Sequence, residues 1–160
     1  MATPTYDLLE SVTLATAASS VTFSSIDTTT YTDIILVTEC IGGSSSARLG
    51  FRFNGDTGSN YSTVITERDN SDSDTNTYFN AQLGSALQNS TMLTIHSIMD
   101  ANATNKHKSI IGRANNADRG LAGMQAGRWA NTSRITSITC LSYGADFLTA
   151  STFAIYGIVA

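Results

Sequence analysis

The chain has 160 residues, of which 41% are hydrophobic and only 14% are charged, and it carries a formal net charge of −4 with a pI near 4.9. This length suits one domain with a sizeable core, and the hydrophobic content excludes a disordered chain. The acidic balance argues against a nucleic-acid partner, and the absence of any ~18-residue apolar run argues against a membrane partner.

The first residues predict a short arm followed by strands. We expect Met1 to Thr5 to form an N-terminal arm, without the basic and apolar regions of a signal peptide, and residues 6–160 to form a single β-sandwich domain. Loose alternation predicts a strand over Tyr6 to Leu14 and a second over Val21 to Ser25. Asp27 to Thr30 is typical of a turn.

The third predicted strand is almost continuously apolar. Ile34 to Val37 contains four branched or long aliphatic residues in a row, which favours a short strand buried on both faces over a helix. Gly42 to Ser46, with sequence GGSSS, predicts a flexible loop tip after this strand.

The stretch Ala47 to Ser62 predicts a strand, a sharp turn and a second strand. Leu49 to Phe53 alternates apolar and other residues with period two, as a half-buried strand does. The glycines at 55 and 58 offer two places where the backbone can take positive φ, and a new strand is expected from Tyr61. A phosphate-binding loop is disfavoured, because no lysine and no helical pattern follow.

Asp69 to Asn76 is the most polar stretch, and we interpret it as a solvated loop. Asp72, Asp74 and Asn76 have the spacing of calcium ligands, but Thr77 and Leu83 stand where an EF-hand needs Gly and Glu. Further along, Ala81 to Leu87 is expected to be a loop or a single helical turn.

Two histidines fall on strands that we expect to be neighbours. His96 lies within an apolar strand over Met92 to Ile98, and His107 lies within a strand over Lys106 to Arg113. A metal pair is conceivable, but no third ligand has a suggestive spacing, so two polar surface histidines are the favoured interpretation.

The last third of the chain predicts three more strands. Gly123 to Ala130 is a glycine-interrupted strand carrying the only tryptophan, Trp129, which is expected in the core rather than at an interface. Ile135 to Leu141 is the next strand, and Phe153 to Ala160 is an apolar last strand that should be paired within a sheet.

The two cysteines lie 100 positions apart, each inside an apolar strand. A disulfide or a reactive thiol is one interpretation, but two buried small hydrophobic residues, Cys40 and Cys140, are favoured.

Together these elements predict an all-β, antiparallel β-sandwich of roughly ten strands, jelly-roll-like in form. The 23 threonines support this fold class, because a branched Cβ favours strands. No nucleophile elbow is present, and Glu10, Glu39 and Glu67 are the only glutamates. We therefore expect no enzyme, and predict no catalytic, cofactor-binding or metal-binding residues and no cofactor.

Four segments carry a resemblance that spans nearly the whole chain in order: Ser19 to Ile26 (SSVTFSSI), Arg52 to Ser62 (RFNGDTGSNYS), Gly127 to Thr132 (GRWANT) and Ser151 to Ile158 (STFAIYGI). In these segments the chain resembles a family of small virion structural proteins of tailed bacteriophages, cyanophages among them. The family often has proline after the first segment, where this chain has Asp27, and this difference affects only the turn expected there.

The resemblance implies a structural role in a virion. The expected function is that of a capsid decoration (cement) protein that binds the outer capsid surface and stabilises the head, with the major capsid protein as partner and a homotrimer as the assembly. The arm and the loops at 42–46 and 69–76 are the parts expected to reach neighbours. The alternative is a tail-fibre or head-fibre domain that contacts a host surface glycan.

Overall fold

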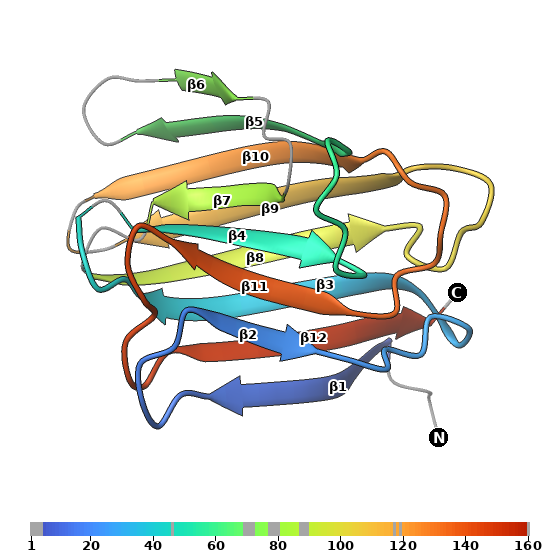
Figure 1. Cartoon of the computed structure of the whole chain (residues 1–160), viewed down its shortest axis with the longest axis horizontal. Coiled ribbons are helices and arrows are strands. Elements are labelled where there is room, and N and C mark those ends of the chain that lie inside the picture. The colour runs from blue at the N-terminus through green and yellow to red at the C-terminus, as the bar shows by residue number, and fades with distance from the viewer. Residues whose placement is uncertain are drawn as a thin grey trace.

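The computed structural model of this protein describes residues 5–45, 47–68, 73–76, 81–86, 90–116, 118 and 120–159, with the backbone alone for 68, 73–76, 82–86 and 159. Within these residues twelve strands form two stacked sheets (Figure 1). Every strand pair is antiparallel. The predicted all-β, antiparallel β-sandwich is therefore confirmed, and the expected number of roughly ten strands is close to the twelve described.

The larger sheet has eight strands in the order β1-β12-β3-β8-β9-β10-β5-β6. Consecutive strands are antiparallel neighbours in β8, β9 and β10 and in β5 and β6, whereas every other connection crosses from one sheet to the other. Their bounds are β1 Tyr6–Thr13, β12 Thr152–Val159, β3 Tyr31–Ile41, β8 Thr91–Met99, β9 Lys108–Asn116, β10 Leu121–Trp129, β5 Tyr61–Arg68 and β6 Ser73–Asn76.

The smaller sheet has four strands in the order β2-β11-β4-β7 and covers one face of the larger sheet (Figure 1). Its strands are β2 Ser20–Phe23, β11 Ile138–Tyr143, β4 Arg48–Phe53 and β7 Gln82–Ala86. The small sheet, with half as many strands, covers only one face of the large sheet and, among the described residues, leaves the other face open.

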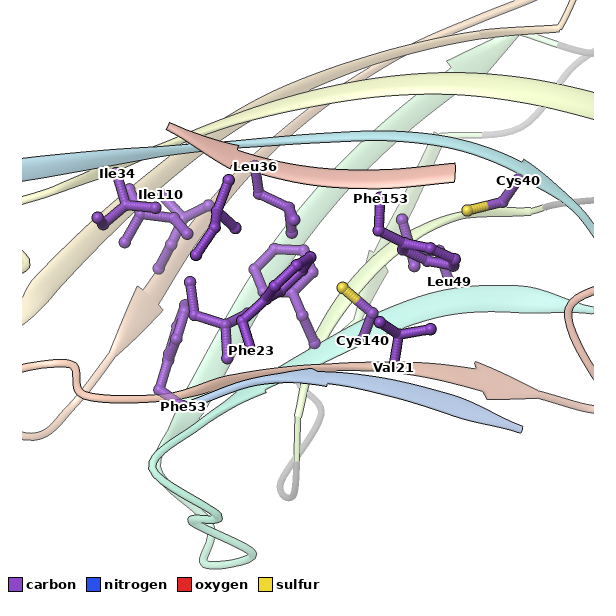
Figure 2. Close-up of a cluster of buried hydrophobic side chains, with 14 of the residues drawn as sticks. Val21, Phe23, Ile34, Leu36, Cys40, Leu49, Phe53, Ile110, Cys140 and Phe153 are labelled. Carbon is purple, nitrogen blue, oxygen red and sulfur yellow. The ribbon is translucent and has the colours of Figure 1, made fainter. Parts of the chain in front are cut away.

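The core lies between the two sheets and follows the period-two alternation of the strands. β9, for example, alternates strictly between buried and exposed residues from Lys108 to Asn116. Figure 2 shows side chains from both sheets meeting in this layer. The large sheet contributes Ile34, Leu36, Ile110 and Phe153, and the small sheet contributes Val21, Phe23, Leu49 and Phe53, all buried.

The turn after β4 fixes one end of the sandwich. Asn54 and Gly55 have positive φ (51° and 66°), and the Asp56 N–H donates to the carbonyl of Phe53 at 2.9 Å, closing a tight turn. The Asp56 carboxylate then accepts hydrogen bonds from Trp129 Nε1 (2.7 Å) and from the Gly58 N–H (2.8 Å). The turn therefore ties β4 to the end of β10.

The expectation of positive φ is confirmed for Gly55 and wrong for Gly58, which is not among the positive-φ glycines of the described residues. At Gly58 a side chain is excluded by lack of room. A Cβ there would lie 2.9 Å from Asn60 Nδ2 and 3.1 Å from Asp56 Oδ1, and Asn60 Nδ2 donates a hydrogen bond to the Asp56 carboxylate.

Two segments expected to be loops contain strands. Residues 73–76 of the polar stretch form β6 by pairing with β5, and residues 82–86 form β7 by pairing with β4. Both segments become strands because their backbones hydrogen-bond to an open sheet edge, and the local side-chain composition does not predict this pairing. The loop at 42–46 is held at its start, because Gly42 bridges Phe147 and the Gly43 N–H donates to the Asp146 carbonyl.

Candidate interaction surface

The outer face of the large sheet, defined here as the side chains that point away from the small sheet, is unusually apolar. The register brings one side chain from each of seven adjacent strands into a row across this face. The row runs Leu8, Tyr156, Ile35, Ser97, Ile111, Ala126, Val64. Six of its seven members are apolar or aromatic, whereas the solvated face of an antiparallel sheet is normally polar.

A second row lies one pleat away and continues the same character. It runs Ala154, Val37, Ile95, Arg113, Met124, Thr66. Met124 is 68% exposed, and Ile111 and Val64 in the first row are each 49% exposed. Contiguous exposed apolar surface of this kind marks sites of protein contact.

The outer face explains the apolar run of the third predicted strand. Ile34 and Leu36 are fully buried in the core, as the sequence predicts, but Ile35 and Val37 are only half-buried on the outer face. The expectation of a strand buried on both faces is therefore wrong for the isolated chain, because no element of the described residues covers this side of β3.

Charged side chains are few on this face and carry both signs: Asp33 and Arg128 lie one pleat beyond the first row, and Glu39 and Arg113 lie on its other side. Arg113 lies beside Ile95 in the register, and Glu39 lies beside Leu93 on the opposite side of β8. The ion pair within the described residues joins Lys106 to Asp100 and engages neither of them. A shallow depression of ≈ 70 Å³ lies next to Arg113, lined also by Leu93, Ile95, Ala114 and Asn115.

The predicted pair of surface histidines does not occur. His107 is exposed in the turn before β9, but His96 is buried on the inner face of β8, with its ring 4.8 Å from that of Phe51 between centroids. Burial lowers the pKa of His96 to about 4, so the imidazole is neutral at pH 7. The interpretation of His96 as a surface residue is wrong, because the sequence pattern does not say which face of β8 the small sheet covers.

Glycine makes room for His96. A Cβ at Gly112, directly across from it on β9, would lie 2.3 Å from His96 Cδ2 and 2.7 Å from Gln125 Cγ. The two polar side chains therefore close over a position that only glycine can occupy. Gln125 is 5% exposed, and its amide atoms have no hydrogen-bond partner among the described residues.

The cysteines are buried free thiols, as predicted. Cys40 projects from β3 and Cys140 from β11, so they approach the same core layer from opposite sheets (Figure 2). Burial raises the pKa of Cys40 to about 12 and that of Cys140 well above its usual value. Neither thiol is therefore ionised at neutral pH, and neither can act as a nucleophile in the folded chain.

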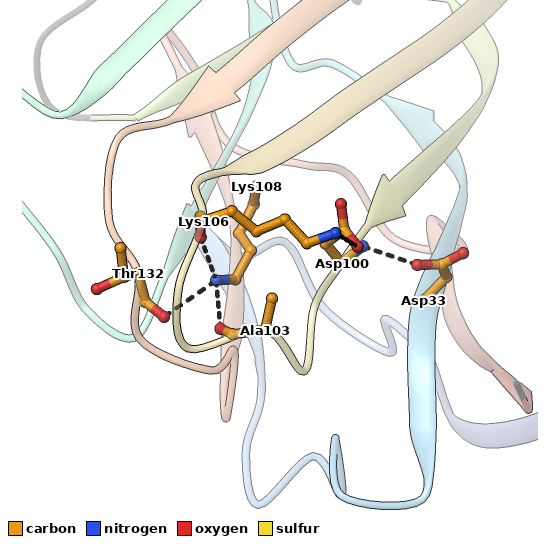
Figure 3. Close-up of polar contacts among 6 residues, drawn as sticks. All are labelled: Asp33, Asp100, Ala103, Lys106, Lys108 and Thr132. Carbon is orange, nitrogen blue, oxygen red and sulfur yellow. Dashed lines mark hydrogen bonds and ion pairs between the residues drawn. The ribbon is translucent and has the colours of Figure 1, made fainter.

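A buried lysine that the sequence analysis did not single out lies at the end of β9. Figure 3 shows its ammonium group donating to three carbonyls, those of Ala103 (2.7 Å), Lys106 (3.2 Å) and Thr132 (3.3 Å). Burial lowers the pKa of Lys108, but the three acceptors use all three of its donors. Lys108 thus joins two loops and is not available as a base. Its inward position in the alternation of β9 is the only sequence signal of this role.

The second depression of the surface, ≈ 290 Å³, lies between β1 and the segment after β2. Its lining includes the carboxylate residues Glu10 and Asp27 and the hydroxyls of Ser24 and Ser25, together with apolar side chains. Hydrogen bonds from Thr29 and Thr30 lower the pKa of Asp27 to about 2. The Asp27 carboxylate is therefore engaged in its own turn, as the sequence predicts for Asp27 to Thr30.

Other candidate sites of the sequence have no counterpart among the described residues. Residues 69–72 and Thr77 of the possible calcium loop lie outside them, and no group of three or more His, Cys, Asp or Glu side chains in the described part could hold a metal ion. Trp129 is fully buried, as expected for a core residue. In the same part of the chain, no helix has the length and apolarity to cross a membrane.

No protein-family model and no curated protein sequence matches this chain. Among solved structures, an exo-inulinase from Aspergillus awamori aligns with 12% identity and a TM-score of 0.47, covering 96% of this chain, which spans 29% of the inulinase chain. CG-16, a homodimeric agglutinin from chicken liver, aligns with 12% identity and a TM-score of 0.37 over 84% of this chain and 98% of its own. The Caenorhabditis elegans galectin LEC-6 aligns with 7% identity and a TM-score of 0.38 over 94% and 96%. Similarities this weak say nothing about activity or ligand.

Proposed function

We propose that this protein is a non-catalytic structural protein of a bacteriophage virion, most directly a capsid decoration (cement) protein that binds the outer capsid surface and stabilises the head. The observation that carries the proposal is the apolar outer face of the large sheet. A broad surface of this kind, in which Met124, Ile111 and Val64 are exposed, is suited to contact with protein rather than to turnover of a small substrate.

The chemistry of the described residues supports a role without catalysis. The two thiols are protonated and buried, His96 is neutral and enclosed, and the ammonium group of Lys108 is used by three carbonyls. Cys40 pairs in register with Met92, four positions from His96 along β8, and both side chains are buried, whereas His107 is exposed in the turn before β9. The assignment to a phage virion rests on the four sequence segments that resemble the virion family.

Contacts with a capsid lattice would be many and individually weak. Loops at the ends of the sandwich, such as the turn at Asn54 and Gly55, can reach neighbouring subunits, and several copies in one assembly would multiply their affinity. The trimer expected from the sequence is one such assembly and stays a prediction. The major capsid protein is the proposed partner.

A count of copies per virion tests the proposal. Quantitative mass spectrometry of purified particles is expected to give on the order of hundreds of copies, in fixed ratio to the major capsid protein. Particles lacking the protein should release their DNA at lower temperature than complete particles. A few copies that co-purify with tails would contradict the decoration function.

A fibre domain that contacts a host surface glycan is the second candidate. The depression of ≈ 290 Å³ beside β1 favours it, because Ser24, Ser25 and Glu10 present groups that can hydrogen-bond a hydroxyl-rich ligand. Copies confined to tail or head fibres, together with retention on immobilised host glycan, would support this function over decoration.

A further inference from the structure

We propose that the outer face of the large sheet binds the outer face of a second copy of this chain, the two copies being related by a two-fold axis. Self-association is a property of the purified protein, so this inference does not depend on the proposed virion function. In this inference, a second copy of the chain covers the two apolar rows that begin with Leu8 and Ala154.

The size of the face suits a stable pair. Its six inner strands, β12, β3, β8, β9, β10 and β5, are 8 to 11 residues long. With strands about 4.8 Å apart and a rise of about 3.3 Å per residue, they cover roughly 24 Å by 28 Å, or about 700 Å². A standard protein interface buries about 800 Å² on each partner, so two such faces are large enough, whereas incidental contacts are about half that size.

Two charges near the middle of the face, Glu39 and Arg113, complement those of an identical face. Glu39 pairs in register with Leu93 and Arg113 with Ile95, so the two charges lie on opposite sides of β8 and one pleat apart. A two-fold axis in the plane of contact that crosses β8 between Leu93 and Ile95, perpendicular to the line from Glu39 to Arg113, places Glu39 of each copy over Arg113 of the other. Two symmetric ion pairs then flank an apolar centre formed by Leu93 and Ile95 of both copies. The exposed side chains of Ile111 and Met124 lie on the Arg113 side of β8, where they face the β3 and β12 side of the other copy.

The β1 edge of the sheet is less suited to binding a second copy. β1 is an edge strand, but its register shifts between Leu8 and Glu10, and the strand carries the charged residues Asp7 and Glu10. A bulge and charges on an edge strand oppose the addition of another strand. The outer face is therefore better suited to a second copy than the β1 edge is.

A two-fold contact requires an assembly with an even number of chains. The protein should exist as a dimer, or, if the trimer expected from the sequence also forms, as a hexamer of two trimers joined through this face. In either case, loss of the contact halves the mass. A wild-type protein that is a monomer or a simple trimer would contradict the inference.

The test is sedimentation velocity, with light scattering for mass, on the full chain in the tens of micromolar. The variant Ile111→Glu/Met124→Glu places carboxylates within the apolar face, where both side chains are exposed, and should have half the wild-type mass. Leu148→Glu is the matched control, because Leu148 is 36% exposed and lies outside the sheet, and it should keep the wild-type mass. Circular dichroism confirms that each variant is folded.

A charge exchange tests the orientation of the pair. Glu39→Arg alone and Arg113→Glu alone should each raise the dissociation constant by about ten-fold, because each sets like charges against one another, and the double variant should restore it. Equal weakening in the double variant would overturn the proposed geometry. A monomeric wild type whose binding to capsids is abolished by Ile111→Glu/Met124→Glu would overturn self-association and identify the capsid as the occupant, while leaving the proposed function intact.

Discussion

Gly112 shows how one residue determines the chemistry of another. Because position 112 lacks a Cβ, the His96 and Gln125 side chains can close over it inside the sandwich, and the imidazole is removed from water. Burial without a charged partner favours the neutral ring, which is the physical cause of its lowered pKa.

The stability of the protein should therefore depend on pH through His96. The pKa of this group is about 4 in the folded chain and 6.5 in the unfolded chain, so between these values only the unfolded state binds the proton. The contribution is fully present above pH 6.5 and is lost as pH falls toward 4, by on the order of 3 kcal/mol. Urea unfolding at several pH values should show this loss.

Two matched variants distinguish the contribution of His96 to the pH dependence from that of other titratable groups. His96→Gln should flatten the dependence between pH 6.5 and 4, whereas His107→Gln, at an exposed position, should leave it unchanged. The same slope in His96→Gln and wild type would show that other groups cause the loss.

At the scale of elements, the turn between β4 and β5 organises one end of the molecule. The turn places the Asp56 carboxylate where it accepts a hydrogen bond from Trp129 Nε1. The Tyr61 hydroxyl accepts from the Phe53 N–H and donates to the Asp56 carbonyl, each at 3.1 Å. The turn is defined by its backbone, because nothing lies within 4 Å of a Cβ added at Gly55, yet its φ of +66° is costly for other residues.

The cost of that backbone conformation can be measured directly. Gly55→Val should destabilise the protein by about 1–3 kcal/mol, because a branched side chain resists positive φ. Gly55→Asn, at the same position, should lose much less, since asparagine tolerates the left-handed region. Urea unfolding of both variants provides the comparison, and equal stability of the two would show that the turn relaxes instead of holding its shape.

At the scale of the whole molecule, the two sheets share one core. Trp129 on the large sheet lies 5.3 Å from Phe53 on the small sheet, measured between ring centroids, and both are fully buried. Neither sheet can keep this packing alone, so separation of the sheets and loss of the strands should occur together.

Two spectroscopic probes test this coupling. Trp129 is the only tryptophan, so its fluorescence reports on the contact between the sheets, while far-UV circular dichroism reports on the strands. The two denaturation curves should coincide in midpoint and slope. A fluorescence change at lower denaturant concentration would mean that the small sheet detaches first.

The sequence by itself determined the strands that alternate with period two and the turns rich in Gly, Asn and Asp. Leu49 to Phe53, Asp27 to Thr30 and the burial of both cysteines follow from local pattern, because an alternating strand must bury one face wherever it lies. The class of fold follows for the same reason, since many short alternating strands can be buried only in stacked sheets.

Only the tertiary structure decided which face of each strand is covered and which edges are paired. His96 and the strand at 82–86 were missed because their surroundings come from strands distant in sequence. Lys108 was missed because its three carbonyl acceptors lie in loops whose paths are set by the tertiary fold. The exposure of the outer face could not be predicted either. The sequence pattern at Ile35, Ile111 and Met124 is the same whether these side chains are covered by a second sheet or exposed to solvent. A four-stranded sheet can cover only one face of an eight-stranded one, and this geometry leaves the rows exposed.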